Sequence, residues 1–318
     1  MDNNKIREKL VLALDVEDIN EAKQLVNDLS PYIGTFKVGL QLFCGYGLEI
    51  VNYIKEKNSN FFLDVKLHDI PNTVEKASYN VIKNGANFFN VHATGGIEMM
   101  KAAKKGAMDA ALKYDRKKPL ILAVTVLTSI SQEVLENELS NKKTVEEFVI
   151  QLAKNAKEAG LDGVVASARE LKAIKKALGD DFVVLTPGIR PKWSLKDDQQ
   201  RIATPTSALN DGADYIVLGR AVTSASDRIE AIEKIYQEIK KVIASALEKG
   251  EVRSAEISEA FITITNVIMS PDLKYATVYI MTLNGKNLGV VLEQLNWGVI
   301  VNNFIIVDEE EEYDLGKD

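Results

Sequence analysis

The chain has 318 residues, 46% hydrophobic and 27% charged, with a net charge of −7. This length exceeds one average domain and fits an α/β barrel of about 250 residues plus an appendage. The single cysteine, Cys44, excludes an internal disulfide, and one cysteine with two histidines offers no familiar metal-ligand spacing. No apolar run approaches the roughly 18 residues of a membrane span, and the N-terminus lacks a signal-peptide core, so we expect a cytoplasmic protein.

The charge is unevenly distributed along the chain. From residue 251 to the end there are 12 acidic residues and 4 basic ones, whereas the first 250 residues carry a net charge of +1. This shift in composition predicts a boundary near residue 250. The acidic balance of the last part also argues against a tail that grips nucleic-acid phosphates.

Short apolar runs alternate with amphipathic segments over the first 245 residues. In the segment 19–29, apolar residues recur at helical spacing, which predicts a helix that ends before Pro31. The apolar runs, each followed by such a segment, predict eight strands at 10–15, 35–39, 61–66, 87–93, 119–127, 162–167, 181–188 and 214–219.

Three junctions between helices and strands share one local pattern. In 84–87, 159–162 and 211–214 a glycine stands where a helix ends, and an Asn or Asp follows two residues later, just before the apolar run. Glycine tolerates the left-handed conformation that closes many helices. The repeated unit predicts a closed parallel (β/α)8 TIM barrel; the alternative is an open doubly wound sheet, which the missing GxGxxG after the first strand disfavours.

Charged residues gather at the end of the third predicted strand. Asp64 and Lys66 are two apart, so in a regular strand they share one face while Val65 points to the other. Asp69 adds a third charge before the break at Pro71. One reading is a structural ion pair that closes a barrel layer, but three ionisable groups in six residues favour a functional site.

Other polar residues also fall where predicted strands end, which in a TIM barrel is the face that carries function. A phosphate site is expected after strands seven and eight, where Gly219 permits close approach and Arg220 offers a planar donor fork. The remaining residues of this kind are Asp15, Lys37, His92, Thr125, Thr128, Ser167 and the TPGIR segment 186–190. We interpret His92 as a hydrogen-bonded structural histidine rather than a catalytic base.

The segment FFLDVKLHDIPNTV (61–74) resembles the DxKxxDIPxT motif of the orotidine 5′-phosphate decarboxylase family. The resemblance extends over about residues 9–243, through NVHATGG, AVTVLTS, TPGIR, DDQQRIATP and VLGRAV in the family's order. It implies conversion of orotidine 5′-monophosphate to uridine 5′-monophosphate and CO2, the last step of de novo pyrimidine synthesis. It also implies a homodimer and neither cofactor nor metal.

The same resemblance implies a role for each matching residue. Lys66 would protonate C6 of the pyrimidine, Asp64 would lie beside the substrate carboxylate, and Asp69 would reach across from the partner subunit. The implied substrate-binding residues are Thr73, Asp15 and Lys37 at the ribose, Thr128 at the pyrimidine edge, and Gln199, Gly219, Arg220 and Arg190 at the phosphate. The polar segment 191–205 is a candidate lid.

The last part of the chain has a different pattern. Residues 261–285 predict two strands joined by a Ser-Pro-Asp turn, and SPDLKYATVY resembles ribosome-binding factor A, a small KH-like RNA-binding family. Residues 255–260 are a candidate for the end of that family's first helix and 288–296 for the start of its next one, and 308–318 is an acidic tail. The expected organisation is therefore a decarboxylase-like barrel at 1–245 and a partial α+β segment at 251–318.

Two further functions remain open from the sequence. A magnesium-dependent sugar-phosphate decarboxylase or synthase of the same superfamily shares DxKxxD, although the IPNT continuation with Thr128 and Gln199 favours the nucleotide substrate. A ribosome-assembly factor with an inactive barrel is the alternative from another class. The missing helices and the lack of a basic surface in the last segment argue against RNA binding.

Overall fold

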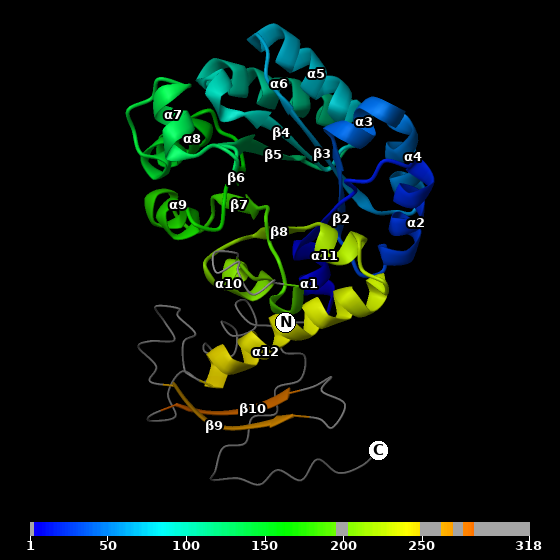
Figure 1. Ribbon diagram of the computed structural model, residues 1–318, viewed down its shortest axis with the longest axis vertical. Coiled ribbons are helices and arrows are strands. Elements are labelled where there is room, and N and C mark those ends of the chain that lie inside the picture. The colour runs from blue at the N-terminus through cyan, green and yellow to red at the C-terminus, as the bar shows by residue number, and fades with distance from the viewer. Residues whose placement is uncertain (1–2, 195–202, 249–261, 270–275, 283–318) are drawn as a thin grey trace. The chain divides into compact units, whose positions relative to one another are not determined.

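The computed structural model describes residues 3–194, 203–248, 262–269 and 276–282. Eight parallel strands form a closed barrel in the order of the sequence, and helices surround it (Figure 1). The ring closes between the first and last strands, where Leu10 lies opposite Ile216. The strands are β1 Leu10–Ala13, β2 Thr35–Gly39, β3 Asn60–Leu67, β4 Phe88–His92, β5 Leu120–Val124, β6 Gly163–Val165, β7 Val183–Thr186 and β8 Tyr215–Leu218. The predicted TIM barrel is confirmed.

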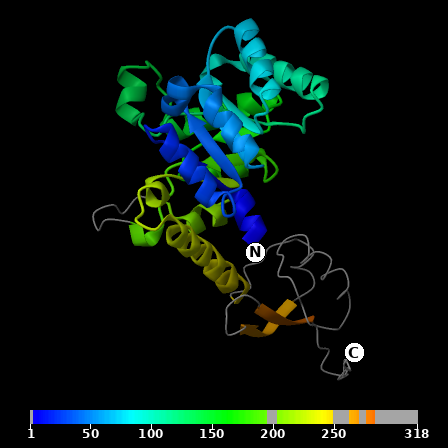
Figure 2. The ribbon, with the colours of Figure 1, turned by 90° about the vertical axis from the view of Figure 1, so that its right-hand side faces the viewer.

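Helices connect successive strands, as the alternating pattern predicts. They are α1 Asn3–Lys9, α2 Ile19–Leu29, α3 Leu40–Tyr46, α4 Leu48–Glu56, α5 Pro71–Lys83, α6 Ile97–Lys113, α7 Gln132–Asn137, α8 Val145–Glu158, α9 Leu171–Leu178, α10 Pro205–Asn210, α11 Arg220–Thr223 and α12 Arg228–Glu248, with short 3-10 turns at Ala93–Gly95 and Lys192–Ser194. Helix α2 has the predicted bounds: the Asp18 side chain caps its start, and its apolar stripe is buried. Helices α5 and α6 lie side by side in two perpendicular views (Figures 1 and 2).

The three repeated junctions have a common structure at the amino end of the barrel. Gly85, Gly160 and Gly212 have φ angles of +92°, +77° and +105°, so the predicted left-handed turns are present. The Asn or Asp two residues later has a second role that the sequence did not predict. Its side chain accepts a hydrogen bond from the backbone N–H of the second residue of the preceding strand: the pairs are Asn87 with Phe61, Asp162 with Ile121 and Asp214 with Val184, at 3.1, 3.0 and 2.8 Å.

Apolar side chains fill the interior of the barrel between its two ends. The buried cluster comprises Val11, Ala13, Phe62, Phe88, Leu122, Leu185 and Val217, one or two from each contributing strand. Phe62 and Phe88 lie opposite each other on β3 and β4, with ring centroids 6.2 Å apart. This cluster is a packed core that fills the barrel. The polar residues that follow it along the strands therefore lie at the carboxyl end.

Strand β3 departs from the regular geometry that the sequence predicts. Leu63 lies opposite Phe89 and Leu67 opposite Val91, so residues 64–66 of β3 face the single residue Asn90 of β4. Lys66 has a φ of +53°, a left-handed conformation that is uncommon for a residue with a side chain. The predicted strand is present and Asp64 and Lys66 both line the same cavity, but a bulge rather than regular alternation sets the direction of Lys66.

Several strands are also shorter than predicted. Strand β5 ends at Val124 and β6 at Val165, so Thr125, Thr128 and Ser167 lie in the loops that follow them. Strand β1 ends at Ala13, which places Asp15 beyond it. The apolar runs continue past the last paired residue because the first loop residues also pack on the barrel.

The chain divides into two compact units, of which one is Arg7–Ile235 and contains the barrel. The other includes two antiparallel strands, β9 Ile262–Met269 and β10 Ala276–Thr282, with an irregularity at Tyr279 and Ile280. The two predicted strands of 261–285 are thus present, whereas the predicted turn between them and the segments 255–260 and 288–296 lie outside the described residues.

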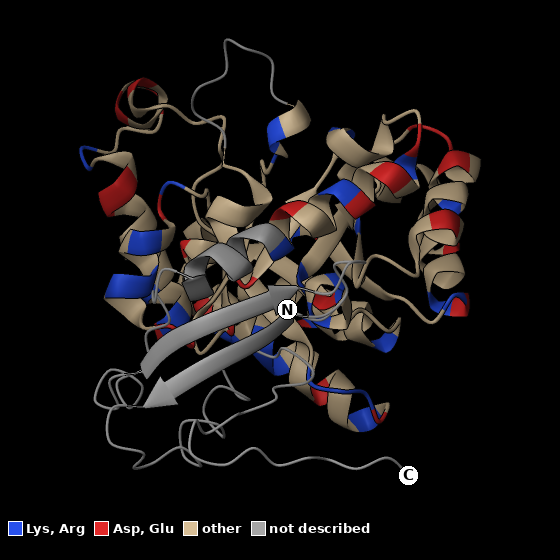
Figure 3. Cartoon of the chain, turned by 90° about the horizontal axis from the view of Figure 1, so that it is seen from below, with Lys and Arg blue, Asp and Glu red and all other residues tan. Residues whose placement is uncertain are grey.

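Basic and acidic residues are interspersed on the helices around the barrel in the view of Figure 3, in agreement with the near-zero net charge of this part of the sequence. None of the helices in the described ranges is long and apolar enough to cross a membrane.

Candidate active site

A cavity of about 1020 Å³ opens at the carboxyl end of the barrel strands. Val124, Leu185 and Val217 form part of its apolar floor, at the ends of β5, β7 and β8. Eight of the eleven residues to which the family resemblance gives a role line it together: Asp15, Lys37, Asp64, Lys66, Thr128, Arg190, Gly219 and Arg220. Lys66 and Arg220, which are far apart in the sequence, therefore share one site.

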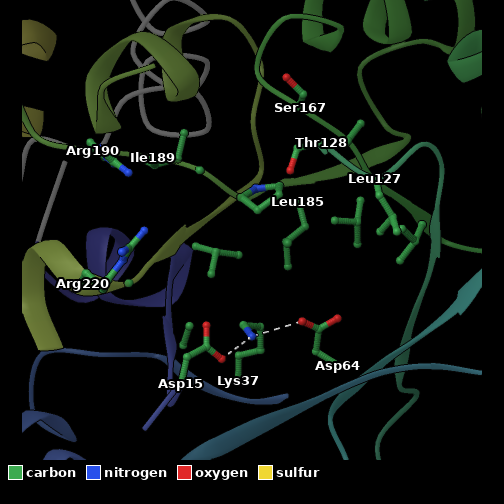
Figure 4. Close-up of a pocket in the computed structure, with 18 of the residues that line it drawn as sticks. Asp15, Lys37, Asp64, Leu127, Thr128, Ser167, Leu185, Ile189, Arg190 and Arg220 are labelled. Carbon is green, nitrogen blue, oxygen red and sulfur yellow. Dashed lines mark hydrogen bonds and ion pairs between the residues drawn. The ribbon is translucent and has the colours of Figure 1, made fainter. Parts of the chain in front are cut away.

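Four charged side chains of alternating sign form a row along one wall of the cavity. The Lys37 ammonium lies 3.0 Å from Asp15 Oδ1 and 3.1 Å from Asp64 Oδ2, and these contacts are drawn in Figure 4. The Lys66 ammonium lies 2.8 Å from Asp64 Oδ1. Only 10% of the Lys37 side chain and 14% of the Asp64 side chain are exposed, so this part of the row is shielded from water. A structural ion pair that closes a barrel layer needs only two opposite charges. This row has four charged side chains beside an open cavity, which favours a functional site.

Opposite charges hold the two buried members of the row in their ionised forms. Burial alone would lower the pKa of Lys37, but the carboxylates of Asp64 and Asp15 outweigh it and the pKa is raised. Burial alone would raise the pKa of Asp64, but the charge of Lys37 and hydrogen bonds from Lys66 and Asn90 outweigh it and the pKa is lowered. Lys37 and Asp64 therefore keep their opposite charges across the neutral pH range.

Asn90 contacts two residues of the cavity wall and was not singled out from the sequence. It is fully buried on β4, its Nδ2 donates to Asp64 Oδ1 at 2.6 Å, and its Oδ1 accepts from the backbone N–H of Lys66 at 2.9 Å. A signal was present in the sequence. Asn90 is the polar residue inside the apolar run FFNV, and it is two residues from Phe88, so it shares the face of Phe88, which points into the barrel.

Arginine side chains lie on another side of the cavity. Figure 4 shows Arg190 and Arg220 on the same side, away from the row of Asp15, Lys37 and Asp64. Gly219 precedes Arg220 where β8 passes into α11, and a Cβ at this glycine would meet no described atom within 4 Å. Guanidinium groups beside open backbone suit a planar or tetrahedral anion such as phosphate.

Thr128 and Ser167 lie together on a third side of the cavity, beside apolar residues that include Leu127 (Figure 4). Ser194 and Ser224 also line the cavity and were not singled out from the sequence. Serine is common at loop ends, and no local pattern separates these two from the other serines. The cavity thus has three sides: the row of alternating charges, the side with Arg190 and Arg220 that suits an anion, and the side with Thr128, Ser167 and apolar residues that suits a flat ring.

Two expected site residues, Asp69 and Thr73, do not line this cavity, and a third, Gln199, lies outside the described residues. Asp69 and Thr73 are exposed, at the end of the β3 loop and in the first turn of α5, and neither is among the residues that line the cavity. The Asp69 carboxylate accepts a hydrogen bond from the Ile70 N–H at 2.6 Å. Gln199 and most of the candidate lid 191–205 lie outside the described residues.

The two histidines contact each other rather than the cavity. The rings of His68 and His92 are 5.6 Å apart. Burial, together with repulsion from His68 and Lys66, lowers the pKa of His92, so the neutral ring is favoured. Within the described ranges, no group of three or more His, Cys, Asp or Glu is arranged to hold a metal ion.

Fold and cavity together define a class: a TIM-barrel enzyme with an ionised Asp–Lys row and an arginine-lined anion side at the carboxyl ends of its strands. A sequence model described as "Orotidine 5'-phosphate decarboxylase / HUMPS family" matches residues 8–235, and the chain belongs to this family. A second model, ribosome-binding factor A, matches residues 231–297. The two matches overlap within α12.

Curated relatives and solved structures agree with the first match. Orotidine 5′-phosphate decarboxylase of Moorella thermoacetica is 46% identical over 74% of this chain and 94% of its own length. That of Syntrophomonas wolfei is 48% identical over 74% of this chain and 99% of its own length. The crystal structure of the Lactobacillus acidophilus enzyme of the same name is 39% identical, has a TM-score of 0.64, and the match covers 72% of this chain and 98% of that one.

Proposed function

We propose that the chain decarboxylates orotidine 5′-monophosphate to uridine 5′-monophosphate, with Lys66 as the proton donor to C6. The observation that carries this assignment is that Lys66 and Arg220 line one cavity, so a single nucleotide can contact both. The family match and the relatives named for this activity support the reaction. The reaction belongs to pyrimidine biosynthesis.

In this proposal the bond between C6 and the substrate carboxyl carbon breaks, CO2 leaves, and the electron pair stays on C6. The pyrimidine ring cannot delocalise that pair, so the developing charge needs an external cation. The Lys66 ammonium supplies this charge and then its proton, which completes the product. Asp64 holds the ammonium at 2.8 Å and is itself held by Lys37, so little reorganisation accompanies the reaction.

Asp64 has a second part in the proposal. Its carboxylate lies beside the carboxylate of the substrate, and the repulsion between the two groups is relieved as CO2 leaves. Because Lys37, Lys66 and Asn90 keep the pKa of Asp64 low, the residue does not escape this repulsion by taking up a proton at neutral pH.

The remaining residues bind the parts of the nucleotide that do not react. Asp15 and Lys37 hold the ribose hydroxyls, and Thr128 contacts the pyrimidine edge. The phosphate is bound by Arg190, Gln199, Gly219 and Arg220. Interactions with a remote phosphate supply binding energy that can position the ring and exclude water over the reacting carbon.

We further propose a cytoplasmic homodimer in which Asp69 and Thr73 complete the site of the partner subunit. Both residues are exposed and outside the cavity of their own chain, and the intervening Ile70 is 66% exposed. An exposed isoleucine flanked by polar residues suits an interface, which has an apolar core and a polar rim. The barrel domain is assigned to residues 1–245 and the second segment to 251–318.

The decisive experiment follows orotidine monophosphate consumption by absorbance, with and without a chelator. We expect turnover in both conditions, whereas a magnesium-dependent sugar-phosphate enzyme would not consume this nucleotide. Lys66→Ala should lower kcat at least about a thousandfold, since it removes both the proton donor and the charge at C6, while uridine monophosphate still binds. Near wild-type turnover of this variant would refute the role of Lys66.

Arg220→Ala provides the matched change on the anion side of the cavity. It should raise KM by about ten- to hundredfold, because one charge-assisted contact to the phosphate is lost. An unchanged KM would remove Arg220 from the phosphate site without affecting the assignment of the reaction.

A second candidate function rests on the match of residues 231–297 to ribosome-binding factor A. The antiparallel pair β9 and β10 in this range is a specific observation in its favour. Co-sedimentation of the full chain with small ribosomal subunits tests it. The Lys66→Ala variant should co-sediment equally well if binding depends on the C-terminal segment alone, and failure of both proteins to co-sediment would dismiss the candidate.

A further inference from the structure

The bulge in β3 leaves a backbone group of the proposed proton donor without a strand partner. Residues 64–66 of β3 stand opposite Asn90 alone, so the regular ladder of hydrogen bonds is interrupted there. The amide side chain of Asn90 replaces the missing strand contact, because its Oδ1 accepts from the Lys66 N–H at 2.9 Å. The left-handed conformation of Lys66 is therefore held by a side chain rather than by the sheet.

The other end of the same amide fixes the carboxylate that pairs with Lys66. Asn90 Nδ2 donates to Asp64 Oδ1 at 2.6 Å, and the Lys66 ammonium binds the same oxygen at 2.8 Å. Asp64 Oδ2 is occupied by Lys37. One fully buried amide thus holds both the backbone of the lysine and the carboxylate that the lysine contacts.

We infer that Asn90 is a positioning residue for the proposed decarboxylation: its amide locks the Lys66 backbone and the Asp64 carboxylate together and thereby fixes the direction of the Lys66 ammonium. The inference rests on the proposed function. An apolar residue of similar size at position 90 would leave the Lys66 N–H and one acceptor site of Asp64 without their partner. Misplacement of a reacting group by about 1 Å can cost about a hundredfold in rate.

The chain contains a matched control for this amide. Asn87, in the same loop-to-strand segment, also accepts a hydrogen bond from a β3 backbone N–H, that of Phe61, at 3.1 Å. It lies at the opposite end of the barrel and is not among the residues lining the cavity. Asn87→Ala and Asn90→Ala therefore each remove a side-chain acceptor from a β3 backbone N–H, one remote from the site and one in contact with Asp64 and Lys66.

The experiment compares kcat for orotidine monophosphate, the Kd of uridine monophosphate and the Tm of the full-length variants. We expect both alanine variants to lower Tm by about 3–8 °C, since each leaves a backbone N–H without its acceptor. Asn90→Ala should lower kcat about ten- to hundredfold with the Kd changed less than about threefold, whereas Asn87→Ala should keep kcat within about twofold. Equal kcat values for the two variants would overturn the inference.

Asn90→Asp is an isosteric variant that tests the same inference if Asn90→Ala does not fold. The new carboxyl can still accept from the Lys66 N–H, but when ionised it repels Asp64 instead of donating to it. The ionisable groups around this pair are Asp15, Lys37, Lys66 and His92. Because a shared proton restores the donor, kcat relative to wild type should rise as pH falls from 8 to 5; a constant ratio would contradict the inference.

The wild-type protein separates failure of the inference from failure of the proposed function. A wild-type protein without turnover would overturn the proposed function, and the inference with it. Wild-type turnover together with an unimpaired Asn90→Ala variant would overturn the inference alone.

Discussion

The two ends of the barrel use the same residue types in opposite ways. At the amino end, Asn87, Asp162 and Asp214 each bind a backbone N–H of the neighbouring strand, so their polar atoms serve the fold. At the carboxyl end, Asp64 and Lys66 bind each other beside an open cavity, in a bulge and with a left-handed backbone. Polar groups at one end complete the sheet, whereas those at the other end form a site that the sheet supports.

The difference also appears in how charge is compensated. Asp214 binds Lys175, whose ammonium additionally donates to the backbone carbonyls of Asp180 and Phe182. The charges of this pair are thus compensated by each other and by neighbouring backbone groups. In the cavity, by contrast, Lys66 has one carboxylate partner and faces space that a ligand can fill. The comparison predicts that variants at the carboxyl end mainly affect catalysis and variants at the amino end mainly affect stability.

Among the variants that test this comparison, the largest effect is expected for Asp64→Asn at the carboxyl end. The variant keeps the shape of the side chain but removes the charge between two lysines, so kcat should fall at least about a hundredfold. We also expect a loss of about 3 kcal/mol in unfolding free energy at pH 7, because two ammonium groups lose their shared partner. Steady-state kinetics and denaturant unfolding measure the two effects.

The stability part of this prediction depends on pH with a defined sign. The folded state lowers the pKa of Asp64, so the carboxylate contributes stability above its unfolded pKa of about 3.9. That contribution is lost as pH falls through the lower folded pKa. The difference between wild type and Asp64→Asn should therefore shrink in acid; a difference that grows there would show that the charge does not stabilise the fold.

A smaller effect, on stability alone, is expected for Asp214→Ala at the amino end. The change leaves the N–H of the buried Val184 without its acceptor and removes the carboxylate of Lys175, which should cost about 2–3 kcal/mol of unfolding free energy. Asp214→Asn keeps an acceptor and should lose less. Because the folded cavity is unaltered, kcat per folded molecule should remain at the wild-type value, and a large fall in kcat would break the proposed division between the ends.

The smallest effect is expected for His92→Gln, which sharpens the boundary of the site. His92 ends β4 but does not line the cavity, so kcat should change less than about threefold. Since the folded state lowers the pKa of His92, wild type loses stability as pH falls from about 6.5 through the folded pKa, and the variant should lose less. Unfolding curves at several pH values measure this slope, and a kcat loss comparable with that of Asp64→Asn would assign His92 to the chemistry.

Much of the fold could be predicted from the sequence because the elements of each barrel unit are close together in the chain. The apolar run, the amphipathic segment and the glycine at the helix end recur within about 30 residues, and Gly85, Gly160 and Gly212 have the conformation that the pattern predicts. The second function of Asn87, Asp162 and Asp214 was not readable, since their partners lie on strands about 20–40 residues earlier in the chain. A hydrogen bond between strands has no local signal.

Part of the site could also be predicted from short stretches of sequence. Charged residues at predicted strand ends identified Asp15, Lys37, Asp64, Lys66 and Arg220, because a parallel barrel brings all carboxyl ends to one face. The bulge at Lys66 and the role of Asn90 depend on the register between β3 and β4, which no pattern within either strand defines.

By itself, the sequence determined the kind of fold and the residues that could take part in chemistry, because periodicity and strand-end polarity are properties of short stretches. The tertiary structure alone decided which of these residues meet. It placed Lys37 between two carboxylates, gave Lys66 a left-handed backbone conformation and brought Asn90 within hydrogen-bond distance of the Lys66 N–H. Distances between side chains on different strands arise only when the barrel closes, and the chemistry of this site is defined by those distances.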